Sequence, residues 1–174
     1  LRSLKDKELI DLGKGRKLEA LYGPGHAKHH YTFYDEYSKT LFMGDTLGLI
    51  YPHGNFVQPN LPPPDFNKEV LFNTLDELYK LDLNYLALAH FGIHNNPYEL
   101  IINAKQNIEE WIVFINNLND MSDEFAIESI RSWVRGNYEF LNIDKNTIDN
   151  YINNANFEMQ INGIRNYLIN KKNP

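Results

Sequence analysis

Three side chains that can bind metal ions follow strand-like segments in the first part of the chain. His26 comes directly after a Gly-Pro-Gly turn, Asp45 ends an apolar run, and His90 ends another. Loops at strand ends are where a sheet usually presents its functional groups. Imidazole and carboxylate groups can hold two cations and acidify a water shared between them, which gives a hydroxide nucleophile near neutral pH. These residue types therefore predict a hydrolytic metal centre.

The remaining histidines lie in the same part of the chain, because all six fall between positions 26 and 94. With no cysteine present, any metal must be held by His, Asp and Glu. His29 and His30 are neighbours in an extended segment, so only one of them can face the site, and we favour His30. We expect His30, His53 and His94 to contact substrate or to support the ligands, although a solvated loop position is an equal alternative for His53 and His94.

The net charge of the chain indicates whether it can bind nucleic acid. The chain has 17 Lys+Arg against 23 Asp+Glu, a formal charge of −6, and no basic run interleaved with aromatic residues. Such a surface repels a nucleic-acid backbone, so we expect no nucleic-acid partner. No apolar stretch approaches the roughly 20 residues that span a bilayer, and the N-terminus lacks the pattern of a signal peptide. The sequence thus predicts a soluble, cytoplasmic protein with no membrane partner.

Hydrophobic spacing divides the chain into two regions, 1–95 and 96–174. The first alternates strand-like segments with turns, and it includes a hairpin around residues 13–15, a helix at 67–81 and a strand at 84–89 that leads into His90. Five prolines within residues 48–66 predict a long loop, of the kind that can cover a substrate. The second region predicts helices that begin at Asn96-Pro97 and at Ser122, the latter ending at Gly136, with two more at 144–154 and 157–171.

Three segments resemble motifs of the metallo-β-lactamase superfamily. Residues 22–30 (YGPGHAKHH) are similar to its Pro-Gly-His segment, residues 41–46 (LFMGDT) to its Phe-x-Gly-Asp segment, and residues 88–92 (LAHFG) to its last ligand segment. They occur in the family's order and with family-like spacing, over about the first 95 residues. The resemblance implies an α/β fold in which this chain forms the C-terminal βα half of an αββα sandwich, followed by a helical C-terminal region.

The same resemblance implies roles for three residues. His26 would complete the three-histidine set of a first metal, Asp45 would bridge both metals at the catalytic centre, and His90 would complete the ligands of the second metal. Two Zn²⁺ ions are the expected cofactors, with iron or manganese as alternatives. The family's His-x-His-x-Asp-His segment, which supplies the other ligands, is absent from this sequence. We therefore expect the remaining ligands in a missing N-terminal half, encoded upstream in the same gene product.

The implied activity is that of a glyoxalase II-like, metal-dependent hydrolase. A metal-bridging hydroxide would attack an ester, thioester or lactone-type carbonyl of a small-molecule substrate, and glutathione specificity is not expected because no matching basic and aromatic cluster is present. One alternative is an enzyme similar to the mononuclear-iron persulfide dioxygenases. Another is a non-catalytic interaction fragment whose apolar helices pack on a partner, including a second copy in a homodimer. With half a site, the chain alone is a doubtful catalyst.

Overall fold

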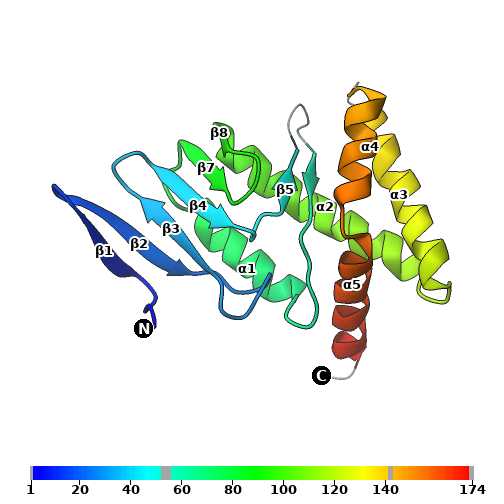
Figure 1. The fold of residues 1–174 in the computed structure, drawn as a ribbon. Helices are drawn as coiled ribbons and strands as arrows, with labels where there is room; N and C mark the ends of the chain where they lie inside the picture. The colour runs from blue at the N-terminus through cyan, green and yellow to red at the C-terminus, as the bar shows by residue number, and fades with distance from the viewer. Residues whose placement is uncertain (1, 52–55, 141–142, 173–174) are drawn as a thin grey trace.

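The chain forms a mixed β-sheet in its first half and a series of helices in its second (Figure 1). A computed structural model describes residues 2–51, 56–140 and 143–172. The strands in this part are β1 Glu8–Gly13, β2 Arg16–Tyr22, β3 Tyr31–Asp35, β4 Thr40–Gly44, β5 Leu49–Ile50, β6 Val57–Gln58, β7 Tyr85–Leu88 and β8 Ile93–His94. The helices are α1 Lys68–Tyr79, α2 Pro97–Asn117, α3 Asp123–Phe140, α4 Lys145–Asn154 and α5 Phe157–Lys172.

Strand direction places the ends of three strands together. The main sheet has the order β1-β2-β3-β4-β7-β8, and only the β4 and β7 neighbours are parallel. Because β2 and β4 are both antiparallel to β3, they run in the same direction as each other and as β7. Their carboxyl ends therefore share one edge of the sheet, which is where side chains of an α/β fold usually form a site. His26, Asp45 and His90 follow these three strands.

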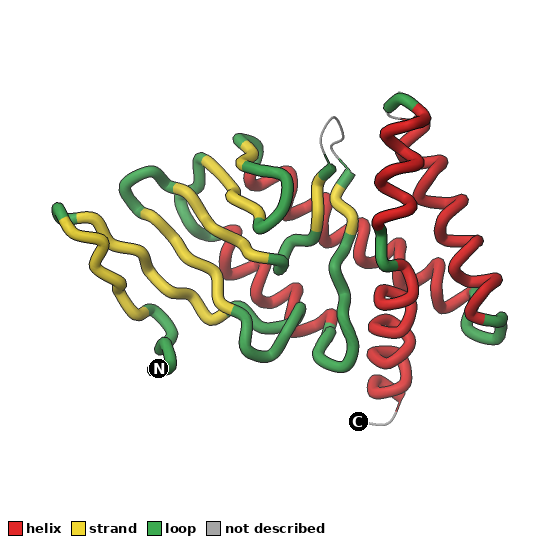
Figure 2. The backbone as a smooth tube through the Cα atoms, in the orientation of Figure 1, coloured by secondary structure: helices red, strands yellow, loops and turns green. Residues whose placement is uncertain are grey.

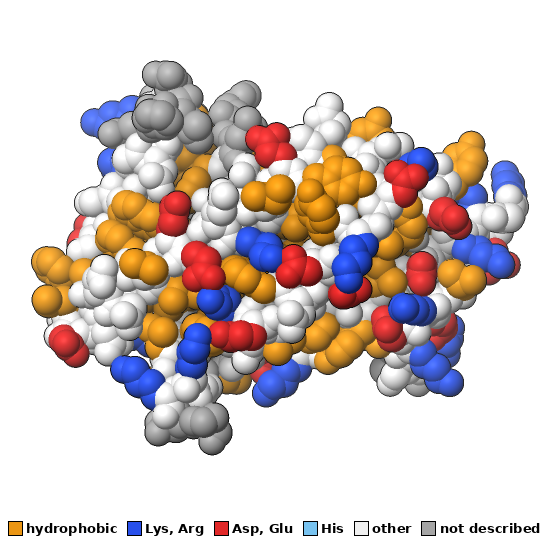
Figure 3. Space-filling view, turned by 180° about the vertical axis from the view of Figure 1, so that it is seen from behind, with side chains coloured by type: hydrophobic (Ala, Val, Ile, Leu, Met, Phe, Trp, Pro, Cys, Tyr) orange, Lys and Arg blue, Asp and Glu red, His pale blue; other side chains and the backbone are white. Residues whose placement is uncertain are grey.

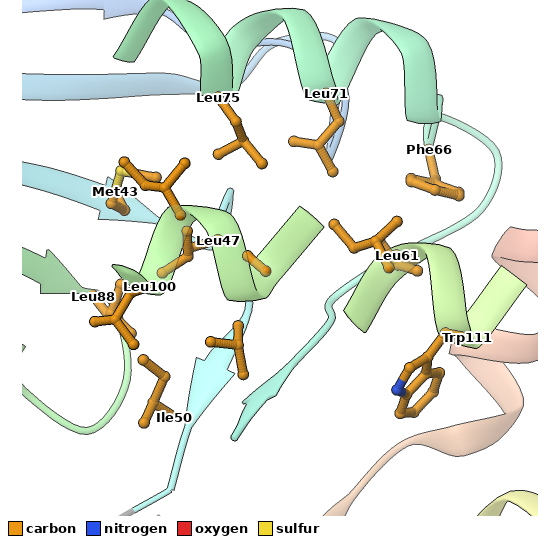
Figure 4. Packing of buried hydrophobic residues seen from close by; sticks show 14 of the residues in the cluster. Met43, Leu47, Ile50, Leu61, Phe66, Leu71, Leu75, Leu88, Leu100 and Trp111 are labelled. Atoms are coloured by element: carbon orange, nitrogen blue, oxygen red, sulfur yellow. The ribbon is translucent and has the colours of Figure 1, made fainter. Parts of the chain in front are cut away.

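One face of the sheet packs on helices α1 and α2, which pass behind the strands in Figure 1. Leu41 and Met43 alternate along β4 and are fully buried on this side. Figure 4 shows Leu71 and Leu75 of α1 pointing toward α2, and Leu47 and Leu100 belong to the same buried cluster. Each such side chain contributes roughly 1.5–3 kcal/mol on burial, so this layer holds the helices against the sheet.

The opposite face of the sheet carries no helix within the described residues (Figure 1), and one row of side chains across it is apolar. The register places Phe33, Phe42, Ala87 and Ile93 side by side across β3, β4, β7 and β8. Phe42 is 41% exposed and Ile93 is 67% exposed. Contiguous apolar surface of this kind marks an interaction site more often than a free surface.

The helical side differs in its surface chemistry. Figure 3 shows acidic and basic side chains interspersed on it, and ion pairs Lys68–Glu109 and Lys105–Asp76 join α1 to α2 there at 2.7 and 2.6 Å. Further along the chain, α2, α3 and α5 meet at Trp111, which is fully buried and contacts Trp133 and Phe157. None of the helices in the described ranges combines the length and the apolar character required to cross a membrane.

Most of the predicted elements are confirmed, and three details were wrong. Residues 48–66 contain a short β5–β6 ladder in which Ile50 pairs with Val57, rather than loop alone, and the prolines lie outside its strands. Strand β8 was not predicted, because a strand of two residues is too short to show a hydrophobic alternation. Gly136 does not end α3, which continues to Phe140. A helical glycine costs about 1 kcal/mol, and the burial of Val134 and Tyr138 around it offsets that cost.

Candidate metal centre

The turn before His26 is clamped to the start of α1. A Cβ atom at Gly25 would lie 2.3 Å from Cα of Leu71, and the φ of Gly25 is +122°, so only glycine fits this position without strain. The backbone N–H of Asn67 donates to the carbonyl of Gly25 at 2.9 Å, and the hydroxyl of Thr74 donates to the carbonyl of Pro24 at 2.7 Å. These contacts hold the turn, and with it His26, at the edge of the sheet.

The imidazole of His26 is oriented by a backbone carbonyl. The residue is 7% exposed, and its Nδ1 lies 2.8 Å from the carbonyl oxygen of Asn60. Because a carbonyl only accepts, the ring hydrogen belongs on Nδ1. The lone pair of Nε2 then remains available to bind a metal ion, as it does in metal-binding histidines.

Asp45 and His90 meet at the carboxyl ends of the two parallel strands. Nε2 of His90 lies 3.5 Å from Oδ1 of Asp45. The backbone N–H of Ala89 donates to the carbonyl of Gly44 at 3.2 Å, which extends the pairing of β4 and β7 up to the two side chains. Oδ1 of Asp45 is buried, and no group in the described ranges gives it a hydrogen bond. A buried carboxylate oxygen without a donor needs an explanation, and a cation provides one.

His30 contacts both the ring of His26 and the backbone of Asp45. Its Nε2 accepts a hydrogen bond from the backbone N–H of Asp45 at 3.3 Å, so its hydrogen is on Nδ1, 2.9 Å from the hydroxyl oxygen of Thr46. Gly44 has a φ of +55°, and a Cβ there would lie 2.6 Å from Nε2 of His30. The ring also packs edge-on against His26, with centroids 5.5 Å apart.

Burial is the main reason why the pKa of His30 is lowered. The neighbouring His26 lowers this pKa further, and the charge of Asp45 partly opposes the shift. A neutral His30 keeps its Nε2 lone pair, which is the atom that accepts from the backbone of Asp45. The ring is therefore suited to holding the backbone of Asp45 in place.

Two of the other histidines, His29 and His94, lie within the described residues. His29 is exposed, whereas His30 contacts the backbone of Asp45. His94 lies on β8 opposite Leu86, and its Nε2 is buried without a hydrogen-bond partner in the described part of the chain. Burial lowers the pKa of His94. His53 lies outside the described residues.

The donors fit a metal ion in type but are too few for a complete site. Imidazole nitrogen and carboxylate oxygen suit zinc, iron and manganese. Oδ1 of Asp45, which has no hydrogen bond in the described residues and faces Nε2 of His90, is consistent with a bound cation. Within residues 2–51, 56–140 and 143–172, however, no group of three or more His, Asp or Glu side chains is gathered closely enough to hold a metal. The roles of His26, Asp45 and His90 as ligands stay predictions.

Two contacts at this site were not predicted. Thr46 directly follows the Gly-Asp pair, so its hydroxyl could have been noticed as a partner for His30. The contact of Asn60 with His26 uses a backbone carbonyl from a distant segment, and every residue type carries such a group. No sequence pattern identifies it.

Comparison with known proteins shows the family of this chain. The sequence model of the metallo-beta-lactamase superfamily matches residues 3–90, half of the chain. The chain therefore belongs to the metallo-β-lactamase superfamily, which includes metal-dependent hydrolases. The matched range ends at His90, the last of the three candidate ligands.

Solved structures confirm the fold. The chain is 26% identical to an archaeal metallo-beta-lactamase superfamily protein from Sulfolobus tokodaii, with a TM-score of 0.52 over 61% of this chain and 38% of that one. It is also 26% identical to a metallo-beta-lactamase family protein from Thermus thermophilus, with a TM-score of 0.56 over 67% of this chain and 38% of that one. The chain thus corresponds to well under half the length of either structure.

Proposed function

We propose that this chain contributes one part of a metal-dependent hydrolase that acts on an ester, thioester or lactone-type carbonyl. The observation that supports the proposal most directly is Oδ1 of Asp45, which is buried without a hydrogen bond in the described residues and lies 3.5 Å from Nε2 of His90 at adjoining strand ends. Membership of a superfamily that includes metal-dependent hydrolases supports the reaction class. A glyoxalase II-like enzyme is the form we favour, because helices follow the last candidate ligand.

Each candidate residue has a defined task in this proposal. His26 offers Nε2, His90 offers an imidazole nitrogen, and Asp45 offers a carboxylate that would lie between two Zn²⁺ ions. Bound zinc supplies a Lewis acid and acidifies water near neutral pH. His30 holds the backbone of Asp45 and leaves its carboxylate free to bind. Iron or manganese could bind the same donors.

The missing donors must come from a second segment, and the uncovered sheet face indicates how that segment would be held. We propose that a partner layer, carrying the remaining histidines and an aspartate, packs on the face formed by Phe33, Phe42, Ala87 and Ile93. Two sheets that pack face to face bury apolar side chains from both layers. The donors of the partner would then meet this chain at the edge where β4 and β7 end.

The test uses the protein that carries both layers. Metal content is measured by mass spectrometry, and hydrolysis is assayed on a panel of thioesters, esters and lactones. We expect two zinc ions per protein, and we expect His26→Ala and Asp45→Asn to lower both metal content and rate, whereas His29→Ala, at an exposed neighbouring position, changes neither. A purified protein without metal whose activity survives His26→Ala would rule the proposal out. One iron with oxygen consumption would indicate a dioxygenase instead.

A further inference from the structure

The segment that contacts His26 is itself held by the C-terminal helices. Residues 57–64 comprise β6 and the stretch that follows it, which runs beside α5 (Figure 2). Helices α2, α3 and α5 each contact this segment through a polar side chain: Asn107 reaches the carbonyl of Val57, Tyr138 reaches Gln58, Gln160 reaches Leu61, and Asn166 reaches the carbonyl of Pro64. The position of the segment therefore depends on residues about 50 to 100 places further along the chain.

The contact between α5 and Leu61 is the tightest of these. Oε1 of Gln160 accepts from the backbone N–H of Leu61 at 2.6 Å, and Gln160 is 3% exposed. A Cβ at Gly163, one turn later, would lie 1.7 Å from the carbonyl oxygen of Leu61, so the helix backbone lies directly against this residue. A buried glutamine that accepts such a bond has little freedom to reorient.

One peptide group joins Gln160 to His26. The carbonyl of Asn60 and the N–H of Leu61 belong to the same planar unit. His26 Nδ1 donates to that carbonyl at 2.8 Å, and Gln160 accepts from that N–H at 2.6 Å. Rotation of the peptide plane would break both hydrogen bonds together. Hydrogen bonds in such a chain also polarise one another, which makes the carbonyl a better acceptor for His26.

We propose that Gln160 is a positioning residue which, through the peptide group between Asn60 and Leu61, keeps His26 in its Nδ1–H form with Nε2 directed outward to bind a metal. The geometry of the two hydrogen bonds carries this inference, and its value to the enzyme rests on the proposed function. The helical region would then act on the metal centre without contributing a ligand to it.

The first test is the tautomer of His26, measured by nitrogen-15 NMR of this chain without metal. The spectra are recorded at about pH 9, because an ordinary imidazole, with a pKa of about 6.5, is neutral there and each neutral tautomer has its own nitrogen shifts. We expect Nδ1 protonated and Nε2 unprotonated in the wild-type chain, with the Leu61 amide protected from exchange. Gln160→Met removes the acceptor at similar size, so we expect a mixture of tautomers. Gln160→Glu retains an acceptor oxygen and should restore the single form.

A matched control separates positioning from general support of the segment. Asn107→Ala removes another helix contact with the same segment, at Val57, but leaves the peptide group of Leu61 untouched. We expect the His26 tautomer to stay unmixed in this variant. A wild-type chain with mixed tautomers would overturn the proposal even if the Gln160 variants failed to fold. A folded Gln160→Met chain with an unchanged His26 would overturn it as well.

The second readout is the binding of Zn²⁺ alone, followed at the His26 signals. Loss of a group that orients a ligand weakens metal binding by about 10- to 100-fold, and we expect about tenfold for Gln160→Met. If Zn²⁺ never perturbs His26 in the wild-type chain, the ligand role in the proposed function fails. The tautomer measurement would still decide whether Gln160 orients the ring, so the two failures can be told apart.

Discussion

Nε2 of His90 and Oδ1 of Asp45 lie 3.5 Å apart because the parallel strands β4 and β7 end side by side. Helix α1 lies between these strands in the chain, as a parallel connection requires. The pair thus depends on the strand, helix, strand unit and not on a local turn. A metal ion that uses both donors would bind to a preformed arrangement.

Asp45→Asn should weaken Zn²⁺ binding by at least tenfold, because an amide oxygen carries no charge to offset that of the cation. Isothermal titration calorimetry of this chain measures the change. Unfolding in urea without metal should change by less than about 1 kcal/mol, since Oδ1 has no hydrogen bond to lose among the residues that the structure describes. Asp76→Asn, on the exposed side of α1, is the control and should bind Zn²⁺ as the wild type does. Equal affinities in the two variants would contradict the role of Asp45.

Gly25→Ala should lower the free energy of unfolding by about 3 kcal/mol, because the added Cβ meets the backbone of Leu71 and the φ of +122° strains an L-residue. The matched control is Gly136→Ala inside α3, where a Cβ meets nothing within 4 Å in the described part of the chain. This second change should raise stability by about 0.5–1 kcal/mol, since alanine favours the helix. Urea unfolding measures both. Equal effects would show that the turn before His26 is not clamped to α1.

Local patterns predicted most elements of this fold and the ends of the strands that carry the candidate site. Partial alternation in residues 17–22 predicted strand β2, the apolar run at residues 41–43 predicted β4, and the helical period after Asn67 predicted α1. Asn67 does cap α1, because its side chain accepts from the N–H of Val70. The motif segments placed His26, Asp45 and His90 at strand ends, and strand order then brought Asp45 to His90.

Contacts made by backbone groups far away in the chain could not be predicted from the sequence. The carbonyl of Asn60 that orients His26 has no side-chain signature, and neither has the N–H of Leu61 that donates to Gln160. Gly136 was taken for a helix end because its local preference is for termini, and tertiary burial decided otherwise. The conformational preferences of single residues and the spacing of motifs do not predict such long-range contacts.

Stability should fall as the pH drops below about 6.5, and His94 should account for part of the loss. Burial lowers the pKa of His94 in the folded chain, so at pH values between that pKa and 6.5 the unfolded chain binds more protons. The folded state is then disfavoured increasingly as the pH falls, while above 6.5 the effect is absent. His94→Leu should flatten the dependence in this window, measured by urea unfolding at several pH values. His30, whose pKa is also lowered, would account for part of the remainder. A variant as sensitive to pH as the wild type would contradict the assignment.

Ile93→Lys should leave the stability of this chain nearly unchanged and weaken its assembly with the partner layer. Ile93 is 67% exposed, so the substitution removes few contacts within the chain, and we expect a change below about 0.5 kcal/mol. In an apolar interface the same lysine would be desolvated without a partner, which should weaken association by more than tenfold.

Sedimentation velocity of mixtures of the two layers measures this association. Val113→Lys is the matched control, because Val113 is 59% exposed but lies on α2, away from the open sheet face. If the wild-type chain alone sediments as a dimer that Ile93→Lys dissociates, the face binds a second copy and the proposed layer is wrong. If neither substitution affects assembly, the face formed by Phe33, Phe42, Ala87 and Ile93 is not the interface, and the missing donors must approach from another side.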